Sequence, residues 1–178
     1  FFADGTGIDV DLGKLIVQGT ALDPVRMTSQ KDQPGQTPAK GDWAGITLNS
    51  GDTGSDLQHL FVEFGQGLHL NGTTTATVGA YTARQNAGAG LRLTNNAILT
   101  TSAALLRYND IGSQIESAAQ LNISQSVIKN NTSNASSDCS QTVNAESNWW
   151  GATDASAVMA TVTADVNVAN HLTSEPVL

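Results

Sequence analysis

A four-residue phrase recurs along this chain at a nearly constant spacing. Gly45-Ile46-Thr47-Leu48, Gly67-Leu68-His69-Leu70 and Gly90-Leu91-Arg92-Leu93 begin 22 and 23 residues apart, and a weaker copy, Gln114-Ile115-Glu116-Ser117, follows after 24. A repeat of about 20 to 30 residues predicts a solenoid, in which each turn packs against the turns beside it. The unit is too short for a pair of helices and its apolar residues alternate with period 2, so each turn should be built of strands.

A second series of strand-like segments runs in phase with this phrase. The segments begin ten residues before successive copies, at Leu57, Ala80 and Ala104, and lead into corners with glycine or asparagine. Both residue types tolerate the positive φ of a sharp corner. Each turn should therefore hold at least two strands. The next copy, at Leu121, arrives only 17 residues after Ala104, so that turn is expected to be short.

The repeat predicts an all-β fold, a single-stranded right-handed parallel β-helix of about seven rungs, because parallel crossovers are almost always right-handed. Residues 1–178 should form one domain, with polar corner loops at 31–40 and 131–141 and a capping segment at 148–178. The sequence opens on Phe1-Phe2 without a starting methionine or signal-peptide pattern, which indicates a piece of a longer precursor. The predicted core residues are Leu48, Leu68, Leu70, Leu91, Leu93, Ile111, Ile115, Ile123 and Ile128.

Three tryptophans flank the repeats. Trp43 stands just before the first copy of the phrase and should fill the interior of the first full turn. Trp149 and Trp150 follow the last clear strand, where a solenoid must cover its final apolar rung. One of this pair is therefore expected to seal the core, although paired tryptophans are also a common platform for sugars.

The composition restricts the environment and the partners. Only 13% of residues are charged, and the net charge is −8 without a basic cluster, which argues against nucleic acid or anionic lipid as a partner. No apolar run is long enough to insert into a membrane as a helix. A surface of Ser, Thr, Asn and Gly is typical of secreted β-solenoids. We therefore expect an extracellular or cell-surface location.

The chain has one cysteine, Cys139, inside the predicted loop at 131–141. It cannot form a disulfide within this chain, so it is either an incidental thiol or part of a bridge to another chain or to a segment of the precursor outside this sequence. No zinc site is expected, because no other residue accompanies it at ligand spacing.

Several segments resemble a known family. They are residues 13–20 (GKLIVQGT), 24–29 (PVRMTS), 41–46 (GDWAGI), 148–151 (NWWG) and 176–178 (PVL). Together they resemble right-handed parallel β-helix repeat proteins of bacterial surfaces, within the pectin-lyase-like superfamily. The resemblance implies the fold and a bacterial source. It does not select an activity, since the family includes adhesins, structural surface proteins and carbohydrate-active enzymes.

Two columns of residues are candidates for chemistry. Glu63, Asn86 and Asp110 should stack on successive turns, with the two acids about 9 to 10 Å apart. That separation is near the upper limit for the acid pair of an inverting glycosidase. The alternative is that Asn86 belongs to a hydrogen-bonded asparagine ladder.

The second predicted column contains His69, Arg92 and Glu116, and it should place Arg92 and Glu116 in an exposed ion pair of little energetic value. If the chain were an enzyme, Arg92 could act as the base of a pectin-lyase type site with calcium-held carboxylates. The acids are scattered along the chain, however, which argues against such a site.

Asp4, Asp9 and Asp11 are weak calcium candidates, because they crowd a glycine-rich segment and calcium prefers oxygen ligands. The alternative is a solvated acidic edge. We expect no cofactor.

Two classes of function remain. The favoured one is a non-catalytic extracellular structural or adhesion-type domain, a surface scaffold or assembly subunit, that binds a cell-surface or extracellular partner such as a polysaccharide or associates with itself. The alternative is a carbohydrate-active enzyme, either a polysaccharide lyase or an inverting glycoside hydrolase, with Glu63, Asp110 and Arg92 as the candidate catalytic residues. The first is favoured because the three histidines are not clustered and no acidic cleft is evident.

Overall fold

Each turn of the chain gives one short strand to each of three parallel sheets. A computed structural model describes residues 1–72, 76–138 and 143–178. Sheet I contains β1 (Gly7–Val10), β4 (Gly45–Leu48), β7 (Leu68–Asn71), β10 (Ala89–Thr94), β13 (Ile111–Ile115) and β16 (Ser133–Ser137). Sheet II contains β2 (Ile16–Gln18), β5 (Asp56–Gln58), β8 (Thr77–Gly79), β11 (Ile98–Ser102), β14 (Gln120–Ser124), β17 (Val143–Asn144) and β18 (Val166–Asn167). Sheet III contains β3 (Val25–Met27), β6 (Leu60–Glu63), β9 (Thr82–Arg84), β12 (Leu105–Arg107) and β15 (Val127–Lys129).

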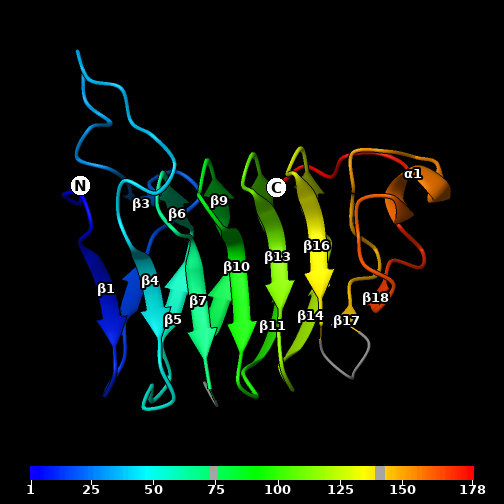
Figure 1. Cartoon of the computed structure of the whole chain (residues 1–178), viewed down its shortest axis with the longest axis horizontal. Helices are drawn as coiled ribbons and strands as arrows, with labels where there is room; N and C mark the ends of the chain where they lie inside the picture. Colours follow the sequence, from blue (N-terminus) through cyan, green and yellow to red (C-terminus); the bar gives the residue numbers. More distant parts are fainter. Residues whose placement is uncertain (73–75, 139–142) are drawn as a thin grey trace.

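The chain coils as a right-handed parallel β-helix, as predicted. In Figure 1 the near strands of sheet I run downward, the chain returns upward behind them, and it advances from β1 on the left to β16 on the right. Five turns, from β1–β3 to β13–β15, have a strand in all three sheets, and β16 and β17 begin a sixth. The estimate of about seven rungs was therefore too high, because residues 19–24 and 28–44 are spent on loops.

The spacing between neighbouring turns is more regular than the sequence pattern suggested. Leu91 lies opposite Leu68 on one side and opposite Ser113 on the other. The weak fourth copy of the repeat is therefore displaced by two residues, and Gln114 lies opposite Arg92. The turn expected to be short is not short, since Leu121 lies opposite Leu99 in sheet II. Because each turn has three strands, the segments that begin at Ala104 and Leu121 belong to different sheets, III and II. The 17 residues between them are therefore less than one turn.

The predicted inward leucines and isoleucines form the core with one exception. Leu48, Leu68, Leu70, Leu91, Leu93, Ile115, Ile123 and Ile128 are all at most 2% exposed. Ile111 is only half-buried, because it is the first residue of β13, beside a corner. Alternate residues of a strand point to opposite faces, which is why the period-2 pattern identified this core.

The tryptophans lie near the two ends of the coil. Trp43 is fully buried, its ring stacks on Phe2 with centroids 4.3 Å apart, and its indole nitrogen donates to the Glu63 carbonyl at 2.7 Å. At the other end Trp150 is 3% exposed and joins the core, whereas Trp149 is half-buried. The expectation that one of the pair would seal the core is confirmed.

The corners use fewer glycines than predicted. After β5, β8, β11, β14 and β17, the corner that leaves sheet II has a single non-glycine residue at positive φ: His59, Ala80, Ala103, Gln125 and Ser147. Glycine is needed instead at the start of β4 and just before β7, where Gly45 and Gly67 have φ of 78° and 84°. A Cβ at Gly67 would lie 2.0 Å from the Ala89 carbonyl oxygen, so no other residue fits the stack at this position.

The two predicted loops differ in outcome. Residues 31–40 contain no strand and belong to the long connection between β3 and β4, which rises from the N-terminal end of the coil in Figure 1. Residues 133–137 are not a loop, since β16 pairs with β13 and buries Ala135. Small polar residues can form this strand because their backbone groups hydrogen-bond to the neighbouring strand, β13. Cys139 lies outside the described residues.

The chain after β17 covers the last turn. The short helix α1 (Ala155–Met159) begins after Asp154, whose carboxylate caps it by accepting from the Ala157 amide at 3.0 Å. Val158 of α1 is fully buried against the core. Among the described residues no helix is long and apolar enough to cross a membrane.

Candidate functional site

Glu63, the first catalytic candidate, is held between two arginines. It lies on the outer face of β6, yet its side chain has no exposed surface. One carboxylate oxygen accepts from Arg26 Nε and the other from Arg84 Nε. Arg26 also forms an ion pair with Asp32 at 2.7 Å. Because both oxygens are occupied and buried, Glu63 is not placed to exchange a proton with a bound sugar.

The arginines around Glu63 crowd one another. Burial, reinforced by the nearby positive charges of Arg26 and Arg107, lowers the pKa of Arg84 below the usual arginine value. A buried carboxylate between cations compensates part of this repulsion. Glu63 therefore has a structural role in this cluster.

Asp110, the second catalytic candidate, has different surroundings from Glu63. Its carboxylate is exposed and forms an ion pair with Lys40 at 2.8 Å. The predicted column of Glu63, Asn86 and Asp110 is wrong, because Glu63 lies opposite Arg84 in the sheet register. The corners between sheets III and I differ in length from turn to turn, and a constant repeat cannot follow that variation.

The predicted asparagine ladder exists and contains Asn86, joined by Asn109 and Asn131. The Asn86 side chain donates to the Asn109 amide oxygen at 2.9 Å, and the Asn109 side chain donates to the Asn131 amide oxygen at 3.2 Å. Asn109 Oδ1 also accepts from the Asn86 backbone amide at 3.1 Å, and Asn131 Oδ1 accepts from the Asn109 backbone amide at 2.9 Å. Each side chain thus satisfies buried backbone at a corner. The signal in the sequence was an asparagine at 22- to 23-residue spacing.

Arg92 and His69 line a shallow groove on the outer face of sheet I. The groove has a volume of about 220 Å³ and includes Thr47, Gln66 and Gln114. Arg92 forms the predicted ion pair with Glu116 at 2.8 Å, although Glu116 is not in the same column. This groove offers hydrogen bonds to a polar ligand but does not contain Glu63 or Asp110.

His69 is expected to make the folding stability of the chain depend on pH. Its Nε2 lies 2.9 Å from Thr94 Oγ1, and burial together with the charge of Arg92 lowers the pKa of His69. The folded state therefore binds a proton less readily than the unfolded chain, so stability should fall as the pH drops below the ordinary histidine pKa of 6.5. We expect the urea midpoint to decrease between neutral and mildly acidic pH by less in His69→Gln than in the natural chain. An equal decrease in both proteins would exclude His69 as the cause.

The calcium candidates do not converge. Asp4 forms an ion pair with Lys31 at 2.8 Å, and Asp11 accepts from the Asn49 side chain at 2.8 Å. Asp9 lies on β1 opposite Thr47. Within residues 1–72, 76–138 and 143–178, no group of three or more His, Cys, Asp or Glu side chains is arranged to hold a metal ion.

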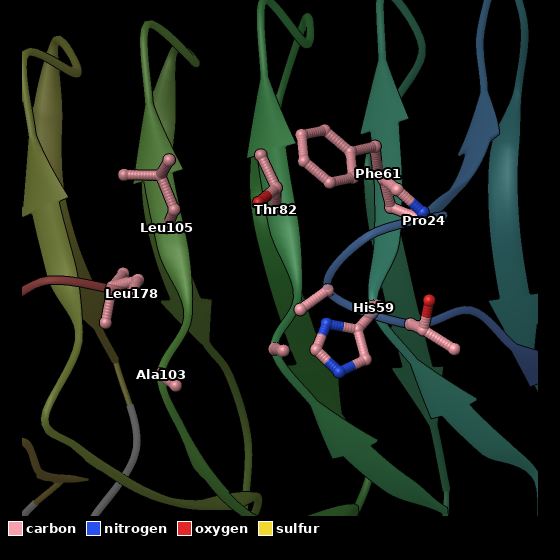
Figure 2. Close-up of a pocket in the computed structure, with 10 residues that line it drawn as sticks. Pro24, His59, Phe61, Thr82, Ala103, Leu105 and Leu178 are labelled. Atoms are coloured by element: carbon pink, nitrogen blue, oxygen red, sulfur yellow. The ribbon is translucent and has the colours of Figure 1, made fainter.

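An apolar groove on the outer face of sheet III was not predicted. Figure 2 shows Phe61, Thr82 and Leu105 on neighbouring strands, with His59 below them and Leu178 beside Leu105. The groove has a volume of about 220 Å³. The sequence offered a weak signal, since Phe61 and Leu105 are apolar at positions where the alternation requires an outward side chain.

Comparison with known proteins gives no further assignment: no family model matches the sequence, and no match is found among curated proteins or solved structures.

Proposed function

We propose that this chain is a non-catalytic domain of the bacterial cell surface, a β-helical scaffold or adhesion-type module that binds a neutral polysaccharide. The observation that carries the proposal is the state of Glu63, whose two oxygens are held by Arg26 and Arg84 in a side chain without exposed surface. The other proposed catalytic residues, Asp110 and Arg92, are also in ion pairs, and they lie on different parts of the coil. The resemblance to bacterial surface β-helix proteins supports the location.

Sheet II provides the face best suited to a polymer with hydroxyl groups. One outward column continues through Thr77, Thr100, Asn122, Asn144 and Asn167. The side chains at Thr100, Asn122 and Asn144 are exposed. Neighbouring strands lie about 4.8 Å apart, so the column repeats hydroxyl and amide groups at a short, regular interval. Each contact is weak, and a long polymer gains affinity by making several of them at once.

A polysaccharide panel tests the proposal. A neutral bacterial polysaccharide in the gel should retard the chain in affinity electrophoresis, and the chain should produce no new reducing ends or unsaturated products, with or without calcium. The triple variant Thr100→Ala, Asn122→Ala and Asn144→Ala should weaken binding by at least about tenfold, because each lost hydrogen bond is worth about 0.5 to 1.5 kcal/mol. Thermal unfolding should change little, since these side chains are exposed.

The matched control replaces three exposed polar residues away from sheet II, Gln36, Thr37 and Thr132, with alanine. This control should bind as the natural chain does. If both triple variants bind equally well, sheet II is not the binding face. If the natural chain depolymerises a substrate and Arg92→Ala or Asp110→Asn does not, the chain is an enzyme and the proposal is wrong.

A further inference from the structure

The outer face of sheet III has a mainly apolar column beside a mainly cationic one. The sheet register places Phe61, Thr82, Leu105 and Val127 in the first column. The same pairs of strands place Glu63, Arg84, Arg107 and Lys129 in the second. The alternate residues between the columns, including Ala83, Leu106 and Ile128, are fully buried in the core. Both columns therefore face away from the core along four successive turns.

Positive charge is concentrated on this face. The chain has eight Lys and Arg residues and a net charge of −8, and Arg26, Arg84, Arg107 and Lys129 all lie on sheet III. Two of these cations, Arg26 and Arg84, form ion pairs with Glu63. Arg107 has no ion pair to the described residues, and its buried Nε has no hydrogen-bond partner there. Its guanidinium lies over the Tyr108 ring, 5.7 Å from the ring centroid.

A segment of the chain already crosses this face. Residues 173–178, which we call the strap, bring Glu175 into an ion pair with Lys129 and place Leu178 in the apolar groove. Figure 2 shows Leu178 next to Leu105. The strap is held weakly, because the Glu175 ion pair is solvent-accessible, Val177 is fully exposed and Leu178 is 53% exposed. It also leaves Arg107 without a carboxylate.

We propose that the outer face of sheet III is a docking site for an extended peptide of a partner protein, with an acidic residue followed three residues later by an aliphatic one, and that the strap competes for this site. The strap shows the chemistry that the face accepts: a carboxylate on the cationic column and an aliphatic side chain in the groove. A partner peptide with a further acidic residue gains Arg107 as well. This site is separate from the polysaccharide face on sheet II and does not depend on it.

The test uses the full chain with a weakened strap, Glu175→Gln and Leu178→Ala. The probe is a fluorescent peptide with the sequence Ser-Glu-Pro-Val-Leu, blocked at both ends, and binding is measured by anisotropy. The weakened-strap variant should bind the probe at least about tenfold more tightly than the natural chain, because a tethered competitor acts at a high effective concentration. A probe with glutamine in place of glutamate should bind more weakly.

Controls identify the site. In the weakened-strap background, Leu105→Asp should reduce binding by about tenfold or more, because it places a charge in the apolar groove. Lys129→Gln should reduce binding by about two- to fivefold, because its ion pair is solvent-accessible. The matched control is Ile98→Asp, an exposed aliphatic residue on β11 in the same turn, which should leave binding unchanged. Should Leu105→Asp unfold the chain, Lys129→Gln still decides, because Lys129 is not part of the core.

Three results would overturn the proposal. The first is a weakened-strap variant that binds the probe no better than its Lys129→Gln derivative. The second is equal affinity for the glutamate and glutamine probes. The third is a natural chain that forms dimers at higher concentration while the weakened-strap variant stays monomeric, which would make the strap of a second copy the occupant.

Discussion

Replacing Leu91 with aspartate is expected to prevent the chain from folding. Leu91 has no exposed surface and lies in the middle of sheet I, between Leu68 and Ser113 on the adjacent strands. An unpaired carboxylate at this depth costs several kcal/mol, about as much as the whole stability of a typical domain, roughly 5 to 15 kcal/mol. Circular dichroism should show loss of the strand signal, and size exclusion should show an expanded or aggregated protein.

The control for Leu91 is the outward position on the next strand. Gln114 of β13 lies opposite Arg92 of β10, and its side chain is half-buried on the outer face of sheet I. Gln114→Asp introduces the same charge beside a cation, so the protein should fold and its unfolding midpoint should change little. A folded Leu91→Asp protein with an unchanged melting temperature would show that the inward and outward faces of sheet I are assigned wrongly.

Replacing Asn109 with alanine is expected to cause the second large loss of stability. Asn109 is 1% exposed, and its side chain donates to the Ala83 carbonyl oxygen at 3.1 Å and accepts from the Asn86 backbone amide at 3.1 Å. Alanine removes the hydrogen-bond partner that Asn109 provides to each of these buried backbone groups. At about 1 to 3 kcal/mol for each such group, the free energy of unfolding should fall by about 2 to 6 kcal/mol. Urea unfolding, monitored by tryptophan fluorescence, measures this loss.

An exposed asparagine provides the comparison for Asn109. Asn122 has the same side chain, faces outward on β14 and is exposed. Asn122→Ala should change the free energy of unfolding by no more than about 0.5 kcal/mol, as is usual for surface substitutions. If the free energy of unfolding falls by the same small amount in both alanine variants, the ladder does not stabilise the corners. Water would then replace the hydrogen bonds that Asn109 makes.

The predicted candidate sites depended on which residues of neighbouring turns lie opposite one another. The repeat predicted this register only in part. The alternation in Gly90-Leu91-Arg92-Leu93 correctly placed Leu91 inward and Arg92 outward. The same repeat placed Asp110 and Glu116 in columns to which they do not belong, because corner lengths vary between turns. An error of one or two residues does not affect the fold class, yet it changes which side chains meet on a face.

The surroundings of Glu63 illustrate what local patterns omit. The sequence identified Glu63 as an acid near a corner, but its partners Arg26 and Arg84 are 37 and 21 residues away. The loop between β3 and β4 adds residues to the first turn, so a constant period could not predict that Arg26 reaches Glu63. The apolar groove and the strap likewise join residues from separate turns, such as Phe61, Leu105 and Leu178.

The sequence by itself determined that this chain is a parallel β-helix and which leucines face its core. It could do so because side-chain direction in a strand alternates with period 2, a property of neighbouring residues. Only the tertiary structure decided the neighbours across turns: the ladder of Asn86, Asn109 and Asn131, the enclosure of Glu63 and the strap on sheet III. These contacts depend on the length of every intervening corner, because each added residue changes where the next strand begins in the stack.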